Sequence, residues 1–585
     1  MKFSFRRRRI QALEDRLQIL ASEFYRILGT GDPDGILAIW EDLGQIANEI
    51  DPYFLNEEEG SAKVMFDAAK LLVPINAALG RWTDTLTMGM ALTLAFGRVS
   101  DEFEAARDVE GQRAAAQAVI GVAAMIAYAA HRTGAPGVFA FLNEAFYMNS
   151  LKSYGSKRAL EDIDETTFWK LETLHRMSFQ STYNRGLLSG LYHFDWRNPS
   201  EGIEEQCRKM LRIFSGSPEL WSHVTYGPIV PLFAGRASGR TLIYLAPLME
   251  GGAAIVFRDA PDGKRLITSY ELPDFRMPHV EELQATLRRI RSGVLGANHL
   301  EAGMVSVGRM IWEPLFRKDP SLLQERLAVL PMGSVSALPV TTSLVNGKIL
   351  CELVDVTVVP TARSLLRAAM LTKHSGDGVC IAADPWVGSH QIFGVVTEAQ
   401  EVAEVYGAKP FIVQRSMEGA GGSKKEVSYE PDIESPIRSR AELIEYVSRS
   451  SIVHLACHGL LNEKEPFDSR LLLGGNVTLR HFLDGRMTSG AVFILSACEA
   501  GSVTGPNPDE YVSFPGVLLN LGVRAIVAPL FPLPDTPDTA KVMKNLHMKM
   551  AEGHSTSRAV GLALTEARRQ GISCEIWGSI VHFGV

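Results

Sequence analysis

Two reactive side chains stand directly after apolar, strand-like runs in the C-terminal third of the sequence. Ile452–Cys457 leads into His458 and Gly459, and Val492–Ala497 leads into Cys498. Cysteine is a strong nucleophile only as the thiolate, and a neighbouring imidazole can accept its proton or stabilise the anion. The two residues therefore predict nucleophilic catalysis by a cysteine–histidine pair.

The interval between the two residues leaves room for a crossover that contains a short helix at Leu479–Leu483. A strand–crossover–strand unit makes its two strands parallel, with their carboxyl ends at the same edge of the sheet. Ligands of open α/β sheets bind at that edge. We therefore expect His458 and Cys498 to approach each other across a crevice there.

Backbone groups and neighbours of the pair also receive expected roles. The N–H groups of Gly459 and Cys498 are the natural oxyanion donors, because glycine lets the backbone come close to a substrate carbonyl. One such donor typically supplies about 3 kcal/mol of transition-state stabilisation. Cys457 is the rival nucleophile, but in a buried strand it should face the core. His454 should be a packed or supporting residue on the same strand.

Other chemistries fit the sequence less well. Gly333–Ala337 lacks the last glycine of a serine-hydrolase G-x-S-x-G elbow, and the phosphate-binding G-x-x-x-x-G-K-[ST] pattern does not occur. A zinc site from His454, Cys457 and His458 would need ligands on both faces of one strand. The sequence therefore predicts neither a metal nor a cofactor. The net charge of −8 and pI near 6.0 argue against nucleic acid as the main partner.

The elements that must position the pair follow from the distribution of apolar residues. From about residue 205 to the end, short β-branched runs alternate with helical stretches such as Val280–Ile290, which predicts a mainly parallel sheet covered by helices on both faces. Residues 1–204 instead show apolar positions at helical spacing. There Ala115–Leu151 fits either a hairpin like a tetratricopeptide repeat or part of an irregular bundle.

The cellular setting is predicted from what the sequence lacks. Arg6–Arg9 are followed by charged helical residues and not by the apolar core of a signal peptide. The apolar stretch Val119–Ala130 is shorter than a membrane span, and six cysteines in a chain of 585 residues are no disulfide framework. These features predict a soluble protein of the reducing cytoplasm.

Two segments resemble the CHAT family of caspase-like peptidases, which belongs with caspases and separase and often occurs with tetratricopeptide repeats. They are Val453–Gly459 and Ile494–Gly501, which contain the histidine and the cysteine. Weaker matches surround them at Leu330–Pro339, Asp384-Pro385, Glu398–Tyr406, Ser469–Leu473, Gly522–Val527 and Ile576–Val581. The departures from the family pattern, Val340, Phe531 and Ile580, fall at packing positions and leave the pair intact.

The resemblance covers residues 205–585 and implies a cysteine endopeptidase with His458 as general base and Cys498 as nucleophile. It also implies a caspase-like fold in two halves, 205–375 (degenerate and supporting) and 376–585 (catalytic), after the helical region 1–204. Enzymes of this clan hold the residue before the cleaved bond in a pocket beside the cysteine. The loop acids Asp468, Asp509 and Glu510 are candidates for a pocket that selects lysine or arginine.

Regulation and the competing function concern the whole chain. A cytoplasmic protease shares its compartment with many proteins, so we expect a protein partner to act through residues 1–204 and through the loops 416–440 and Ser502–Ser513. The alternative from another class is a catalytically silent caspase-like scaffold. The intact histidine–cysteine pair argues against it.

Overall fold

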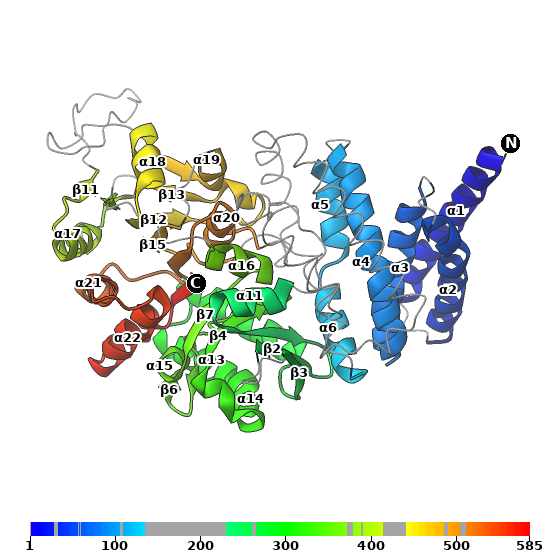
Figure 1. The fold of residues 1–585 in the computed structure, drawn as a ribbon, viewed down its shortest axis with the longest axis horizontal. Helices are drawn as coiled ribbons and strands as arrows, with labels where there is room; N and C mark the ends of the chain where they lie inside the picture. The colour runs from blue at the N-terminus through cyan, green and yellow to red at the C-terminus, as the bar shows by residue number, and fades with distance from the viewer. Residues whose placement is uncertain are drawn as a thin grey trace.

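A computed structural model of the protein describes residues 2–28, 33–55, 58, 60–105, 109–134, 230–259, 265–370, 378–387, 390–392, 394–413, 440–484, 490–503 and 511–585. Within these ranges the chain has a helical N-terminal part and an α/β C-terminal part (Figure 1). Both expectations of the sequence about fold class are confirmed.

The described part of the N-terminal region is made of helices α1 (Lys2–Leu28), α2 (Pro33–Leu55), α3 (Ser61–Ala78), α4 (Trp82–Ala105), α5 (Val109–Ala118) and α6 (Val122–Arg132). Their apolar faces meet in a common core that includes Leu43, Phe54 and Phe96. The apolar stripe at 113–131 is broken between α5 and α6, where Gly121 takes a φ of 76° that favours glycine. The second arm of the predicted hairpin at Ala115–Leu151 lies outside the described residues, so a tetratricopeptide repeat stays a prediction.

One helical stretch in the described residues, Ala114–Arg132, is long and apolar enough to cross a membrane, although 61% of it is buried inside the protein. The apolar run is thus longer than the sequence suggested. Part of it, α6, packs on strands β1 (Thr241–Pro247), β2 (Gly252–Asp259) and β3 (Arg265–Leu272). This burial is what a core helix of a soluble protein shows, and it makes the stretch weak evidence for a membrane span.

Thirteen strands of the described chain form one sheet. Its main path runs β11 (Phe411–Ile412), β8 (Val379–Ala383), β12 (Ile452–Leu460), β15 (Val492–Ala497), β16 (Ala525–Pro529), β17 (Ile580–Gly584), β7 (Asp355–Val358), β4 (Arg326–Pro331), β1, β2, β3. The hairpin β13 (Arg470–Leu472) and β14 (Asn476–Thr478) attaches to the end of β12.

Most strands with a continuous apolar run are parallel, whereas the apolar strand β2 is antiparallel to both β1 and β3. β11, β8, β12, β15 and β16 form one set of mutually parallel strands, and β1, β4 and β7 form a second. The closing strand β17 is antiparallel to β16 and parallel to β7, so it joins the two parallel sets into one continuous sheet. The predicted halves at 205–375 and 376–585 therefore share a single sheet, and the boundary between them stays a prediction.

Helices cover this sheet, as Figure 1 shows. They include α11 (Val230–Ser238), α12 (Met277–Arg291), α13 (Ala297–Val307), α16 (Ala362–Met370), α17 (Gly394–Tyr406), α18 (Arg440–Arg449), α19 (Leu479–Asp484), α20 (Phe514–Asn520), α21 (Pro537–Ala551) and α22 (Thr556–Arg569). Of these, α17 and α21 pack against each other, and α17 also lies on β8 and β12. The strand β12 thus has a helical layer directly over it.

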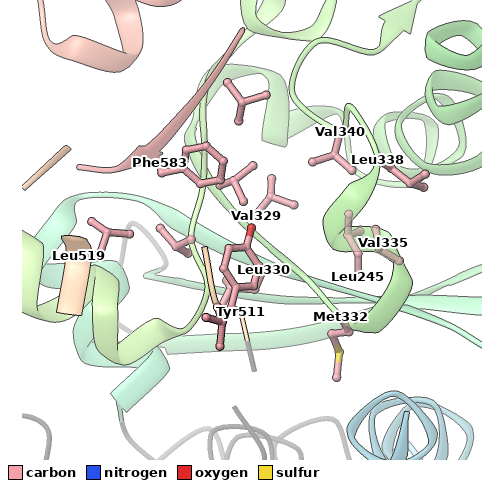
Figure 2. Close-up of a cluster of buried hydrophobic side chains, with 14 of the residues drawn as sticks. Leu245, Val329, Leu330, Met332, Val335, Leu338, Val340, Tyr511, Leu519 and Phe583 are labelled. Atoms are coloured by element: carbon pink, nitrogen blue, oxygen red, sulfur yellow. The ribbon is translucent and has the colours of Figure 1, made fainter. Parts of the chain in front are cut away.

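A buried apolar cluster joins strand β4 to the closing strand β17 and to the segment between β15 and β16. Figure 2 shows Val329 and Leu330 of β4 together with Phe583 of β17 and with Tyr511, which follows β15 in sequence. The side chains of Val329 and Leu330 are 0% and 2% exposed. Large side chains buried this completely stabilise a fold by about 1.5–3 kcal/mol each, so the two halves are held as one body.

Candidate active site

His458 and Cys498 lie at the carboxyl edge of two adjacent parallel strands. The register pairs His454 with Ile494 and, at its end, Cys457 with Ala497. The next position along β12 is His458, and the next after β15 is Cys498. Since paired strands run about 4.8 Å apart, the two residues are neighbours at the edge where the sequence analysis placed them.

The turn that carries Cys498 is held by its own backbone. Glu499 takes a φ of 58°, in the left-handed region that non-glycine residues rarely adopt. The N–H of Ser502 donates to the carbonyl of Glu499 at 2.8 Å, and the N–H of Gly501 donates to that of Pro529 on β16 at 2.9 Å. Residues held in sparsely populated backbone regions cluster at functional sites. This turn therefore presents Cys498 on a rigid support.

Gly459 lies against the backbone of the cysteine. A Cβ atom added at Gly459 would stand 2.3 Å from the carbonyl oxygen of Cys498, far inside van der Waals contact. Only a residue without a side chain lets the two strands approach in this way. The proximity that the oxyanion role requires is present, and the role of the Gly459 and Cys498 N–H groups stays a prediction.

Gly459→Ala is therefore expected to push the Cys498 turn away from β12. We expect a loss of about 1–3 kcal/mol in the free energy of unfolding, the usual cost of overpacking. Chemical denaturation measures it. Gly44→Ala is the matched control, because nothing lies within 4 Å of the added Cβ in helix α2. Equal stability of the two variants would contradict the close approach.

The Cys498 thiol is partly buried and forms a hydrogen bond with the loop that follows β16. Its Sγ donates a long hydrogen bond of 3.9 Å to the carbonyl of Leu533. Burial raises the pKa of this thiol above its ordinary value, and the carboxylates of Glu499 and Asp535 raise the pKa further. Cys498 is therefore a neutral thiol at pH 7 in this state.

The imidazole of His458 is also in its neutral form at pH 7. The side chain is partly buried, and burial lowers the pKa of His458 below 6.5. A neutral imidazole can accept a proton, whereas an imidazolium cannot. The pair can thus work as nucleophile and general base.

His454 lies four residues before His458 on β12, and side chains two apart along a strand share a face. A buried polar network around His454 therefore lies on the same face of β12 as His458. Nε2 of His454 is 3.0 Å from a carboxylate oxygen of Glu398 on α17, and Nδ1 of His454 is 3.1 Å from Nε2 of His547 on α21. Tyr406 completes it with a hydroxyl 2.9 Å from Nδ1 of His547. His454 is 0% exposed, so it supports the packing of the two helices on the strand.

Cys457 has the opposite environment from Cys498. It is 3% exposed, and burial raises the pKa of its thiol far above 9.0. By alternation it projects from the other face of β12 than His458. The structure therefore places it in the core, as the sequence predicts.

Of the three candidate acids of a substrate pocket, Asp468 is the one that lies within the described residues. Asp468 is about half exposed and accepts from Nε of Arg480 at 2.8 Å. Asp509 and Glu510 lie outside the described residues, as do 414–439 and 504–510 of the two loops expected to border the site. A pocket selective for basic residues thus stays a prediction.

Sequence reasoning missed the residues that surround the Cys498 turn. Arg291 from the end of α12 contacts Glu499, Ser502 and Phe531. Glu463 acts electrostatically on both Arg291 and Glu499. No short motif reveals these residues, because Arg291 comes from the first half of the sheet and meets the turn only in the folded protein. The one available signal was the acidic residue directly after Cys498.

Comparison with known proteins gives one family. The model of the CHAT domain matches residues 306–585. A search of curated proteins finds no match to the chain. The matched segment contains β12, β15 and the closing strand β17, and hence the whole edge that carries the histidine and the cysteine. The match to residues 306–585 agrees with the resemblance of the motifs around His458 and Cys498 to the caspase-like CHAT family.

Proposed function

We propose that this protein is a cysteine endopeptidase that cleaves protein substrates with Cys498 as nucleophile and His458 as general base. The observation that carries the proposal is the register of β12 and β15, which puts the two residues next to each other at the carboxyl edge of the sheet. Both side chains are partly exposed there, whereas the described cysteines other than Cys498 are buried. A substrate can reach this thiol.

The proposed reaction follows from the protonation states. Neutral His458 takes the thiol proton as Sγ attacks the carbonyl carbon of the substrate, and the resulting oxyanion is stabilised by the N–H groups of Gly459 and Cys498. The imidazolium then gives its proton to the leaving amine, which leaves an acyl-thioester on Cys498. Water, deprotonated by His458, hydrolyses that thioester and restores both groups.

The pH dependence tests this assignment. Because the pKa of His458 lies below 6.5, its protonation should reduce kcat/KM only as the pH falls below that value. Because burial raises the pKa of the Cys498 thiol above its ordinary value, the thiol is mainly protonated at pH 7. Its alkylation by iodoacetamide, followed by mass spectrometry of the Cys498 peptide, should therefore increase steadily from pH 6 to pH 9.

A small free thiol such as N-acetylcysteine is the reference for that titration and should show the same steady increase. An alkylation rate that is already maximal and flat below pH 7 would contradict the neutral pair. It would indicate a preformed thiolate–imidazolium ion pair instead.

We further propose that a protein partner bound to residues 1–204 controls the activity. Two observations support it. The Cys498 thiol is hydrogen-bonded to the carbonyl of Leu533, and helix α6 of the helical region packs directly on the sheet. A partner can shift the equilibrium between an inactive and an active arrangement only if it binds the active arrangement more tightly. Turnover of the full chain at the rate of mature proteases, unchanged by any partner, would contradict this control.

A further inference from the structure

Arg291 is the last residue of α12 and reaches three segments around Cys498. Its Nε is 3.4 Å from a carboxylate oxygen of Glu499, and one of its terminal nitrogens donates to Oγ of Ser502 at 2.9 Å. Its guanidinium lies 5.5 Å from the centre of the Phe531 ring. A planar guanidinium with five donors can satisfy several partners at once in a way that lysine cannot.

The three partners of Arg291 belong to the two segments that flank Cys498, the turn after β15 and the loop after β16. Glu499 and Ser502 belong to the turn that begins with Cys498. Ser502 also donates through Oγ to the carbonyl of Leu530 at 2.7 Å, which ties the turn to the start of the next loop. Phe531 lies two residues before Leu533, whose carbonyl accepts from the thiol. The Arg291 side chain thus contacts both the turn that carries Cys498 and the loop whose carbonyl accepts a hydrogen bond from the Cys498 thiol.

The contact between Arg291 and the Cys498 turn is an ion pair between two largely buried charges. The side chain of Arg291 is 17% exposed and that of Glu499 is 24% exposed. Burial lowers the pKa of Arg291 and raises that of Glu499, while the attraction between them opposes both changes. Among the described residues, Glu463 and Arg288 are the other charged groups that act on this pair. Without Arg291, a largely buried carboxylate would stand uncompensated beside the thiol, which is costly.

The opposite end of α12 is attached where the helical region touches the sheet. The N–H of Met277, the first residue of α12, donates to the carbonyl of Leu248 at 2.8 Å. Leu248 packs with Tyr128 of α6, and Tyr128 meets Trp82 of α4 with ring centres 5.2 Å apart. Beside this cluster, Nδ1 of His131 is 2.8 Å from Oγ of Ser269 on β3.

The helix between these ends is firmly seated. Its inward positions Val280, Leu283, Leu287 and Ile290 are buried. A 15-residue α-helix is about 22 Å long. A displacement of its start therefore reaches its end as a rigid-body movement, because packed elements shift between discrete arrangements and do not deform continuously.

We propose that Arg291 is a positioning residue for Cys498, and that α12 makes its hold on the Cys498 turn respond to the packing of the helical region on Leu248. This inference rests on the proposed peptidase function for its purpose. Its geometry stands on its own, and so can be tested through the reactivity of the thiol as well as through turnover.

The first test compares Arg291→Met and Arg291→Lys with the unchanged chain. Arg291→Met should slow alkylation of Cys498 by iodoacetamide at pH 8 about tenfold, because the uncompensated Glu499 disfavours the thiolate. It should lower kcat about 10- to 100-fold with KM changed less than threefold, since misplacement of the nucleophile affects the chemical step. Arg291→Lys keeps the charge and should recover most of the alkylation rate but only part of kcat.

Arg289→Met is the matched control, because Arg289 is exposed on the same helix and should leave both rates unchanged. Alkylation and kcat of Arg291→Met within twofold of the unchanged chain would overturn the positioning role. If Arg291→Met does not fold, the same comparison is read from Arg291→Lys. Should the unchanged chain cleave no peptide while the alkylation differences appear, the peptidase proposal fails and the positioning role stands.

The second test addresses the far end of α12. Tyr128→Leu loosens the contact with Leu248 and should change the alkylation rate of Cys498 threefold or more, in the range seen for coupling between distant sites (about 2- to 30-fold). Phe54→Leu is the control, since Phe54 is 1% exposed within α2 and belongs to the same helical region. An unchanged rate in folded Tyr128→Leu, or an equal change in both variants, would overturn the coupling through α12.

Discussion

Replacing Cys498 with alanine is expected to abolish peptide-bond cleavage and to leave the fold intact. Removing a catalytic nucleophile typically costs at least about 10⁴-fold in kcat. The loss of fold stability should be small, because Cys498 is partly exposed at the end of a strand and the change removes one atom. Cleavage of a peptide library, measured together with the thermal midpoint of unfolding, checks both parts.

Cys457→Ala is the matched control for that substitution. It removes the same atom one residue before the catalytic histidine, but from a side chain that is 3% exposed in the core. It should retain activity and lose stability, by about 1 kcal/mol for the small cavity it leaves. An inactive Cys457→Ala beside an active Cys498→Ala would show that the nucleophile has been assigned to the wrong strand face.

Replacing His458 with alanine is expected to have the second-largest effect on activity. Without it the neutral thiol has no acceptor for its proton, and general acid–base contributions are typically about 10²- to 10⁴-fold. The thermal midpoint should change little, because His458 is only partly buried. Turnover at saturating substrate is the measurement, and a loss of less than tenfold would count against the role of general base.

His454→Ala provides the contrast on the same strand. This histidine is buried between Glu398 and His547. Its removal leaves polar groups of Glu398 and His547 without a partner in the core, which destabilises a protein by about 1–3 kcal/mol for each such group. We expect a lower unfolding midpoint, with kcat of the folded fraction near that of the unchanged chain. A stable His454→Ala with no turnover would instead give His454 a direct part in catalysis.

Much of the fold was predictable because its parallel strands are buried on both faces. Strands with no solvated side appear in the sequence as continuous apolar runs, and Val492–Ala497 is found with the predicted bounds. A strand pair with this connectivity must be parallel. For that reason the two apolar runs and the number of residues between them were enough to predict that His458 and Cys498 lie close together.

Other features depend on tertiary contacts that local patterns do not carry. Strand β3 was not predicted, since Arg265–Leu272 lies at the sheet edge and has neither a continuous apolar run nor a strict polar–apolar alternation. The reversed direction of β17 depends on which neighbours it pairs with. The ion pair of Asp468 with Arg480 was not foreseen either, because it forms only when α19 packs beside the loop that carries Asp468. Arg291 was overlooked because its contacts with Glu499 and Phe531 bridge more than two hundred residues of chain.

The central claim is that Cys498 is the nucleophile of a peptidase, and covalent trapping tests it most directly. The full chain would be incubated with a peptide that carries a thiol-reactive acyloxymethyl ketone, and the modified residue identified by mass spectrometry. We predict a single modification on Cys498, lost in Cys498→Ala, strongly reduced in His458→Ala and kept in Cys457→Ala. Modification of another residue, or equal labelling of Cys498 after heat denaturation, would contradict the account.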